Sequence, residues 1–462
     1  MSAKTLSVKR GGVNMTEGNI LRHIIKFAAP LLVGNIFQQM YNMVDTWVVG
    51  NYVSNEAFAA VGSVGSIINM LIGFFTGFST GAGVVISQYY GAGDEKNVSR
   101  ATHTAIAVTA ILCVFFTVLG VFIAPYMVSL MKTPENVRGE SIKYLTIYFL
   151  GITGLLVYNM GSAILRAVGD SQKPFYFILV SAVINTVFDL VFVLVFKMGV
   201  EGVAYATVIA QGVSAILVMI SLFLTKNCIR LSLKKIAINV GLLIKIVKIG
   251  IPTAIQLMLT AFSNVFVQSY INEFGDNYMS AYTAYNKIDQ ILLAPIQAVS
   301  LAATTFVGQN LGIRNVDRAK RGFVTCILIT LVTTVVMLIP VLIFAPNLVG
   351  FFNSKAEVIE YGAMFLRLIS PFYLAFCVDM VFASTFRGAG NPKVTMIIML
   401  TSYVAFRQIY LLIISNIIKN SIIAIIFAYP AGWLVAMIIS LVYYKIKGLN
   451  ISGVVTEEKS NT

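Results

Sequence analysis

The sequence predicts an all-α integral membrane protein with twelve transmembrane helices, arranged as two six-helix bundles related by a pseudo-twofold axis along the membrane normal. Of its 462 residues, 58% are hydrophobic and only 11% are charged, which is too apolar for a soluble globular chain. The apolar runs last about 20 to 28 residues, whereas the strands of a membrane barrel need only about ten. The second half of the chain also repeats the order of the first.

The twelve predicted helices follow from the apolar runs, which short polar loops separate. They cover residues 26–50, 57–86, 101–126, 143–165, 175–197, 199–224, 245–271, 278–307, 320–346, 357–386, 394–416 and 421–445. An even number of crossings places both termini on one side of the membrane. Of 33 Lys and Arg residues, seven fall in the opposite loops and two within spans. Both termini are therefore expected in the cytoplasm, with the chain in the plasma membrane.

The internal repeat begins at Pro30 and Pro252, which occupy matching positions in the first and seventh predicted helices. Counting onward aligns Asn42 with Asn264 without a gap, and ILRAVGDSQKP later matches TFRGAGNPK. Two halves in the same orientation are typical of transporters built from parallel repeats, although channels and structural bundles can also repeat. The predicted divisions are a first lobe over residues 1–225, a basic cytoplasmic linker over 226–244 and a second lobe over 245–462.

Charge and composition narrow the function classes. The net charge of +14 is spread over the loops of one face, which indicates membrane topology and contact with anionic headgroups rather than nucleic-acid binding. With only two histidines, His23 and His103, and no metal or protease-like motif, we do not expect an enzyme. No G-x-x-x-x-G-K-[ST] segment occurs, so we expect no cofactor, and transport would be passive or driven by an ion gradient.

Asp45 and Asp189 lie within predicted spans. A charge there costs about 3 kcal/mol, so charged residues inside a membrane usually have a function. Asn185 precedes Asp189 by one turn on the same helix face. At about 1.5 Å per residue, Asp189 and Thr207 both lie about 12 Å below the outer boundary, with Asp45 at a similar depth. These four residues supply oxygen ligands for Na⁺, and they can equally hold a proton. Alternatively, the carboxylates only bond neighbouring helices together.

The second repeat lacks this set of residues. Asp189 aligns with Arg407, Asn185 with Tyr403 and Asp45 with Val267. A carboxylate cation site therefore belongs to the first lobe. Arg407 either forms a structural ion pair with an acid such as Asp379 or lines a water-filled cavity that receives an anionic part of a substrate. Lys287 and Asp289 face different directions on their helix, and we assign neither of them a role.

The chain resembles the multidrug and toxic compound extrusion (MATE) family over about residues 20 to 445. The motifs that carry the resemblance are APLLVGNIFQQMYNMVDTWVVG, ILRAVGDSQKP and FVGQNLG, together with twelve helices in two repeats. It implies a V-shaped cleft between two bundles and a monomer in the lipid bilayer. It also implies that organic cations are expelled by alternating access in exchange for Na⁺ or H⁺. The set of Asp45, Asn185, Asp189 and Thr207 is similar to the cation site of the DinF-like branch.

The resemblance extends to residues that would line the substrate cleft. Gln38 and Tyr41 match cleft positions of the same branch. We add Asn42, Tyr403, Arg407 and Asp379 to the cleft. The chain departs from the NorM-like pattern, because Thr260 stands where that pattern has a carboxylate on the seventh helix, and Asp379 is displaced by about one turn from its acid on the tenth. The resemblance therefore does not extend to a cation site in the second lobe.

The implied mechanism is an exchange of charges in the first lobe. When both acids are ionised they attract a cationic drug, and Na⁺ or H⁺ arriving from outside neutralises them and releases it. Pro30 either lets the first helix bend or marks its start. The alternative function is a lipid-linked oligosaccharide flippase of the same larger superfamily, which would need a strongly cationic cavity. A channel is disfavoured because no filter or pore ring is visible.

Overall fold

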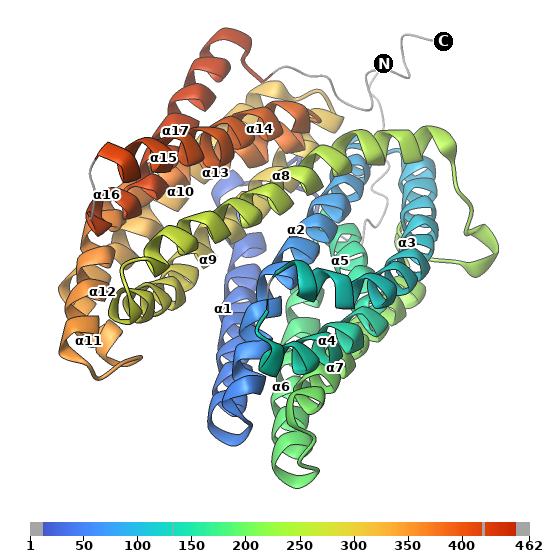
Figure 1. Cartoon of the computed structure of the whole chain (residues 1–462). Helices are drawn as coiled ribbons and strands as arrows, with labels where there is room; N and C mark the ends of the chain where they lie inside the picture. Colours follow the sequence, from blue (N-terminus) through green and yellow to red (C-terminus); the bar gives the residue numbers. More distant parts are fainter. Residues whose placement is uncertain (1–12, 132, 418–420, 450–462) are drawn as a thin grey trace, which may run out of the picture.

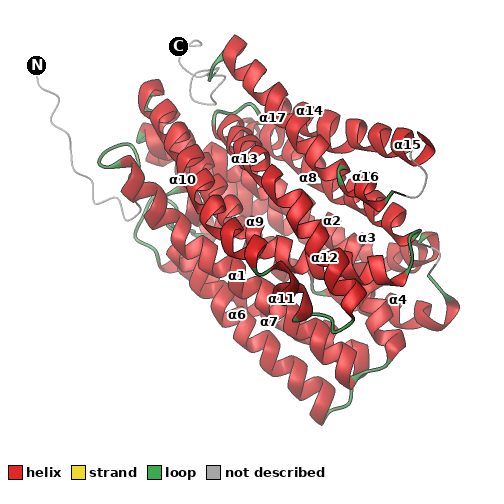
Figure 2. Cartoon of the chain, turned by 90° about the vertical axis from the view of Figure 1, so that its left-hand side faces the viewer, coloured by secondary structure: helices red, strands yellow, loops and turns green. Residues whose placement is uncertain are grey.

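The computed structural model describes residues 13–131, 133–417 and 421–449, which form helices joined by short loops (Figure 1). No β-strand occurs within these ranges (Figure 2). Eleven helical stretches in them are long and apolar enough to cross a membrane, and a pair of helices bent by 46° forms the twelfth. The predicted all-α membrane fold with twelve crossings is therefore confirmed.

The first lobe runs from blue to green in Figure 1. Its helices are α1 (Ile20–Tyr52), α2 (Asn55–Ala92), α3 (Glu95–Leu130), α4 (Glu135–Leu150), α5 (Ile152–Ala167), α6 (Gln172–Leu190), the π-helical η1 (Val191–Val195) and α7 (Gly199–Leu224). The bent crossing is α4 and α5, which meet at Gly151. Pro30 lies inside α1 rather than at its start, so the proline is a place where the helix can bend.

The second lobe runs from yellow-green to red in Figure 1. It follows the short η2 (Leu233–Lys235) and comprises α8 (Val240–Asn272), α9 (Asp276–Gly312), α10 (Val316–Ile343), α11 (Ala345–Gly350), α12 (Ala356–Ile369), η3 (Ser370–Phe372), α13 (Tyr373–Gly388), α14 (Pro392–Met399), the π-helical η4 (Leu400–Phe406), α15 (Arg407–Ile417), α16 (Ile422–Ile426) and α17 (Ala428–Lys447). Helix α8 begins at Val240, within the stretch expected to be linker.

The lobes meet where α2 packs on α8, and α1 packs on α9 in the reciprocal arrangement expected of a two-fold repeat. Glycines allow the close approach of α2 to α8. A Cβ atom added at Gly77 would lie 2.5 Å from the Ala254 backbone, and one added at Gly81 would lie 2.4 Å from the Gly250 nitrogen. These contacts lie in the part of α8 that follows the linker, and we call this end of the molecule the linker side.

The first half of α2, away from the linker side, makes no such approach. A Cβ atom added at Gly62 or Gly65 would meet no heavy atom of a neighbouring element within 4 Å. The two lobes are therefore in close contact on the linker side, and their helices diverge away from it in Figure 1. This is the shape expected of a two-lobed transporter that is open on the side opposite its linker.

The described residues before α1, which we call the N-terminal segment, fasten the first lobe to the second. Arg318 of α10 donates through Nη2 to the carbonyl oxygens of Met15 at 3.2 Å and Glu17 at 2.8 Å. The Gln309 side chain accepts from the Met15 amide at 3.0 Å and donates to the Ala167 carbonyl at 2.9 Å. One glutamine thus joins the N-terminal segment, α9 and the end of α5.

Replacing Arg318 by Ala is expected to loosen the N-terminal segment, because several carbonyl oxygens lose a charged donor. The loss of about 1.4 kcal/mol should accelerate amide exchange in this segment about tenfold. Hydrogen–deuterium exchange of the peptide containing Met15 measures the effect. Lys320→Ala removes an exposed charge from the same helix and serves as the control. Equal exchange in the two variants would show that Arg318 does not hold the segment.

Candidate functional site

Helices α1 and α6 pack together and bring the two predicted acids into contact. The carboxyl groups of Asp45 and Asp189 are close enough to interact directly. Asp189 is fully buried, Asn185 is 1% exposed one turn earlier, and Asp45 is half-buried. The structure thus brings Asp45 and Asp189 together, with Asn185 one turn before Asp189, and we call these three residues the acid cluster.

Most polar side-chain atoms of the acid cluster form no hydrogen bond in the described structure. Asp45 Oδ1 and both carboxyl oxygens of Asp189 are buried and have no hydrogen-bond partner within the described structure. The same holds for Oδ1 and Nδ2 of Asn185. Each such atom costs about 1–3 kcal/mol, and five of them in one place are far from the usual few per hundred residues. The cluster therefore has an unused hydrogen-bonding and ligating capacity that suits a bound cation.

Two tyrosines of α4, which the sequence analysis did not single out, complete the surroundings of the acid cluster. Tyr144 is close to both acids, and its hydroxyl interacts with the side chain of Thr207. Tyr148 lies beside Tyr144 and receives a hydrogen bond from Gln211 at 3.5 Å. In KYLTIYF the two tyrosines are four residues apart and share one helix face, but nothing in the sequence points that face toward the acids.

The predicted cleft residues of α1 have different environments. Tyr41 is half-buried beside Asp45, and its hydroxyl interacts with Gln38. Asn42 is exposed, and its amide donates to Gln39 at 3.5 Å. Gln38 and Tyr41 therefore border the acid cluster, whereas Asn42 lies on the exposed surface of α1.

Two cations, Na⁺ and H⁺, are candidates for the acid cluster. Within the described ranges, no three His, Cys, Asp or Glu side chains converge to hold a metal ion. A Na⁺ ion would therefore rely on two carboxylates together with the Asn185 carbonyl and a hydroxyl, all of them hard oxygen ligands. A proton shared between Asp45 and Asp189 would join one oxygen of each acid, and it is favoured because two neighbouring carboxylates cannot readily both stay ionised.

Of the two alternatives predicted for Arg407, the ion pair with Asp379 is not observed, and Asp379 itself lies in a different environment from the one expected. No ion pair joins them in the described part of the chain, where the ion pairs within 4.0 Å all lie in the first lobe. Asp379 is fully buried and accepts hydrogen bonds from the Tyr403 hydroxyl at 2.6 Å and from Ser440 at 2.9 Å. Asp379 thus supports the lobe interior instead of lining the cleft. Asp379 does not need Arg407 as a partner, because the hydroxyls of Tyr403 and Ser440 each donate to one of its carboxyl oxygens.

A π-helical segment accompanies the charged residue in each lobe. In the first lobe η1 begins two residues after Asp189, and in the second lobe η4 contains Tyr403 and ends just before Arg407. Such insertions are frequent at functional sites. The repeat therefore preserves the backbone irregularity while it replaces an acid by a base.

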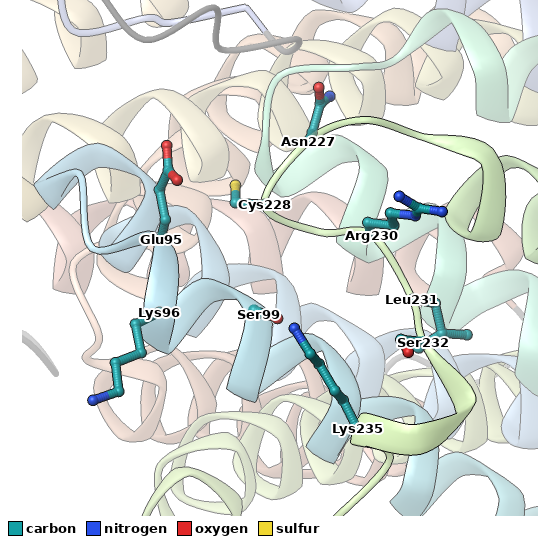
Figure 3. A pocket seen from close by; sticks show the side chains of 9 residues that line it. All are labelled: Glu95, Lys96, Ser99, Asn227, Cys228, Arg230, Leu231, Ser232 and Lys235. Carbon is teal, nitrogen blue, oxygen red and sulfur yellow. The ribbon is translucent and has the colours of Figure 1, made fainter. Parts of the chain in front are cut away.

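A separate hollow of about 620 Å³ lies at the start of α3, against the linker. Figure 3 shows Glu95, Lys96, Arg230 and Lys235 around it, with the end of Lys235 near Ser99. The linker is fixed there because the Ser232 amide donates to the His103 ring at 3.1 Å. This hollow belongs to the basic surface of the linker side and includes none of the predicted site residues.

Comparison with known proteins supplies the remaining evidence. The model of the MatE family matches residues 30–191 and 252–410. The chain is 29% identical over 400 residues to the probable multidrug resistance protein YpnP of Bacillus subtilis, covering 85% of this chain and 88% of that protein. It is 27% identical to the probable multidrug resistance protein YoeA of the same organism, covering 93% and 94%. A solved structure of a MOP superfamily transporter from Pyrococcus furiosus superposes with a TM-score of 0.90 at 20% identity, over 96% of this chain and 99% of that one.

Proposed function

The chain belongs to the MatE family of membrane transporters, and from this premise we propose that it expels small organic cations in exchange for Na⁺ or H⁺ by alternating access. Relatives along most of its length are named multidrug resistance proteins, and multidrug efflux is accordingly its function. The coupling ion, the cationic character of the substrates and the direction of exchange belong to the proposal.

The single observation that supports ion coupling is the set of unpartnered oxygens in the acid cluster. Asp45 and Asp189 contribute three buried carboxyl oxygens without a hydrogen-bond partner in the described structure. Binding Na⁺ or H⁺ there would supply the missing interaction and neutralise the pair. An ionised pair would instead attract a cationic drug, so the two cations would compete for one lobe.

The contacts between the lobes suggest how binding would be converted into movement. The lobes touch through Gly77 and Gly81 on the linker side, whereas a Cβ atom added at Gly62 would meet no neighbouring atom within 4 Å. Helix α1 carries both Pro30 and Asp45, so a change in charge at the acid cluster acts on a helix that can bend. We propose that neutralisation straightens or bends α1 and thereby biases the equilibrium between open and closed forms.

The cellular setting is also part of the proposal. We place the chain in the plasma membrane as a monomer, with both termini in the cytoplasm, because Lys and Arg concentrate on the linker side. The substrates would be small organic cations. The chain would need no cofactor other than the coupling ion, Na⁺ or H⁺. We assign the chain to the DinF-like branch on the four residues Asp45, Asn185, Asp189 and Thr207.

Efflux of ethidium from proteoliposomes tests this function, with a Na⁺ gradient and a pH gradient imposed in turn. One of the gradients should drive efflux by the wild type. Asp189→Asn and Asp45→Asn are each expected to lower gradient-driven efflux at least about tenfold, because a neutral amide cannot exchange one cation for another. The effective gradient identifies the coupling ion.

Glu201→Gln is the matched control, because it removes a carboxylate that is part-exposed on α7 and paired with Lys143 at 3.2 Å. It should leave efflux unchanged. Thermal unfolding controls for misfolding. Asp189→Asn replaces a buried acid whose oxygens form no hydrogen bond in the described structure, so it should not lower Tm. If efflux in Asp189→Asn stays coupled to the same gradient, the acid cluster is not the coupling site.

A further inference from the structure

A cavity of about 170 Å³ lies inside the second lobe, between α8, α9, α13, η4, α15 and α17. It contains one base and one acid, Arg407 and Asp289. Its aromatic walls are Phe376, Tyr403, Tyr429 and Trp433. Because Arg407 aligns with Asp189 in the repeat, this cavity is the counterpart of the acid cluster with the opposite charge at its defining position. We call it the arginine cavity.

The guanidinium of Arg407 is 2% exposed and held in a fixed orientation. Its Nε donates to the Tyr403 carbonyl at 2.8 Å, and its Nη1 donates to Asn264 Oδ1 at 2.7 Å. The rings of Tyr403 and Tyr429 lie 5.7 and 5.0 Å from it, and the Tyr429 side chain also interacts with it. All of these partners are neutral. A buried cation that has only neutral partners is well placed to receive an anion.

Asp289 lines the same cavity on a different wall. Its Oδ1 accepts hydrogen bonds from the hydroxyls of Tyr285 and Tyr373. In the described part of the chain it forms no ion pair within 4.0 Å with Arg407. The two opposite charges therefore face one space without neutralising each other, because each is anchored by its own neighbours.

We propose that the arginine cavity binds the zwitterionic end of an aromatic substrate, with the substrate carboxylate on Arg407, its ammonium group at Asp289 and its ring between the aromatic walls. Arg recognises carboxylates through its planar fork of donors. The aromatic walls supply stacking area and attract the cationic group. A ligand with both charges satisfies both walls, whereas a simple cation leaves Arg407 unpaired.

The size of the cavity limits what it can hold. Sites for whole drug-sized molecules have about 300 to 1,000 Å³, so about 170 Å³ accommodates a small aromatic zwitterion or the charged end of a larger one. Asn264, which fixes the guanidinium, is exposed on α8, so the cavity reaches the surface of its lobe there. A substrate can therefore enter next to the anion-binding group.

Three probes built on one benzene ring test the proposal: 4-(aminomethyl)benzoate carries both charged groups, benzoate only the carboxylate and benzylamine only the ammonium group. Isothermal titration with the purified full-length protein should give tighter binding for the zwitterion than for either single-charge probe. Arg407→Gln should weaken binding of the zwitterion at least about tenfold and leave benzylamine unchanged. Asp289→Asn should weaken the zwitterion and leave benzoate unchanged.

Lys287→Gln is the matched control, because it removes a partly buried positive charge of α9 that does not line the cavity. Arg407→Lys retains the charge without the planar fork, so it should fold and bind the zwitterion with intermediate affinity. The binding assay needs no ion gradient, and Asp189→Asn should bind the zwitterion as the wild type does. The inference depends on the proposed transporter function in one respect only: that function is the reason for calling the ligand a transported substrate. If Arg407→Gln and Lys287→Gln bind the zwitterion equally well, the arginine cavity is not a carboxylate site, even where efflux remains coupled.

Discussion

Gly81→Val is expected to reduce transport at least about tenfold. A Cβ atom at residue 81 would lie 2.4 Å from the Gly250 nitrogen and 2.7 Å from the Ile246 carbonyl oxygen. Both atoms belong to the backbone of α8, so the clash cannot be relieved by a change of side-chain rotamer in α8. The added side chain must therefore push the lobes apart on the linker side and disfavour the form in which they are closed there.

Gly62→Val is the matched control on the same helix, because a Cβ atom at residue 62 meets no neighbour within 4 Å. Both substitutions carry the same change in helix propensity. Spin labels on Lys96 and Arg321, which are exposed on α3 and α10, report the distance between the lobes in a Cys228→Ser background. The distance should increase in Gly81→Val only. Wild-type transport by Gly81→Val would mean that close contact of α2 and α8 is unnecessary.

Asp379→Ala is expected to destabilise the protein by about 3 kcal/mol. Its carboxylate accepts hydrogen bonds from Tyr403 at 2.6 Å and Ser440 at 2.9 Å, and it interacts electrostatically with the buried Arg387. Truncation leaves two donors without an acceptor and removes the compensating charge of a guanidinium that is only 8% exposed. A lower midpoint of thermal unfolding in detergent measures the effect.

Glu273→Ala provides the comparison, since it removes an exposed acid at the end of α8 and should change stability by less than about 0.5 kcal/mol. Equal unfolding midpoints for the two variants would contradict a structural role for Asp379. The loss should extend to the arginine cavity, because Tyr403 bridges Asp379 and that cavity.

Hydropathy, charge and an internal repeat are properties of the sequence itself, and they predicted the fold and the two lobes. They also identified Asp45, Asn185 and Asp189, because an acid in an apolar helix is unusual in any context. The environment of Asp379 could not be predicted, since its hydrogen-bond donors come from η4 and α17, far along the chain. Asp289 was passed over for the same reason, as Tyr373 reaches it from another helix.

Contacts between helices decided the remaining features. The sequence contains many glycines, and nothing local distinguishes Gly81, which touches α8, from Gly62, which faces open space. Tyr144 belongs to a run that reads as ordinary membrane helix, and only the packing of α4 brings it to the acids. The N-terminal segment showed no pattern that would place it on Arg318, because its bonds use backbone carbonyl oxygens.

The π-helical segments η1 and η4 mean that the helices of Asp189 and Arg407 each contain one inserted residue relative to a regular α-helix. In η1 the Phe196 amide donates to the Val191 carbonyl at 3.1 Å, five residues back. If such a surplus residue slides along the helix, the stretch it passes turns by about 100° about the axis while both ends stay in place. The side chains of Asp189 and Arg407 can thus change direction by a rotation within a single helix. This movement is far smaller than the rotation of a whole bundle.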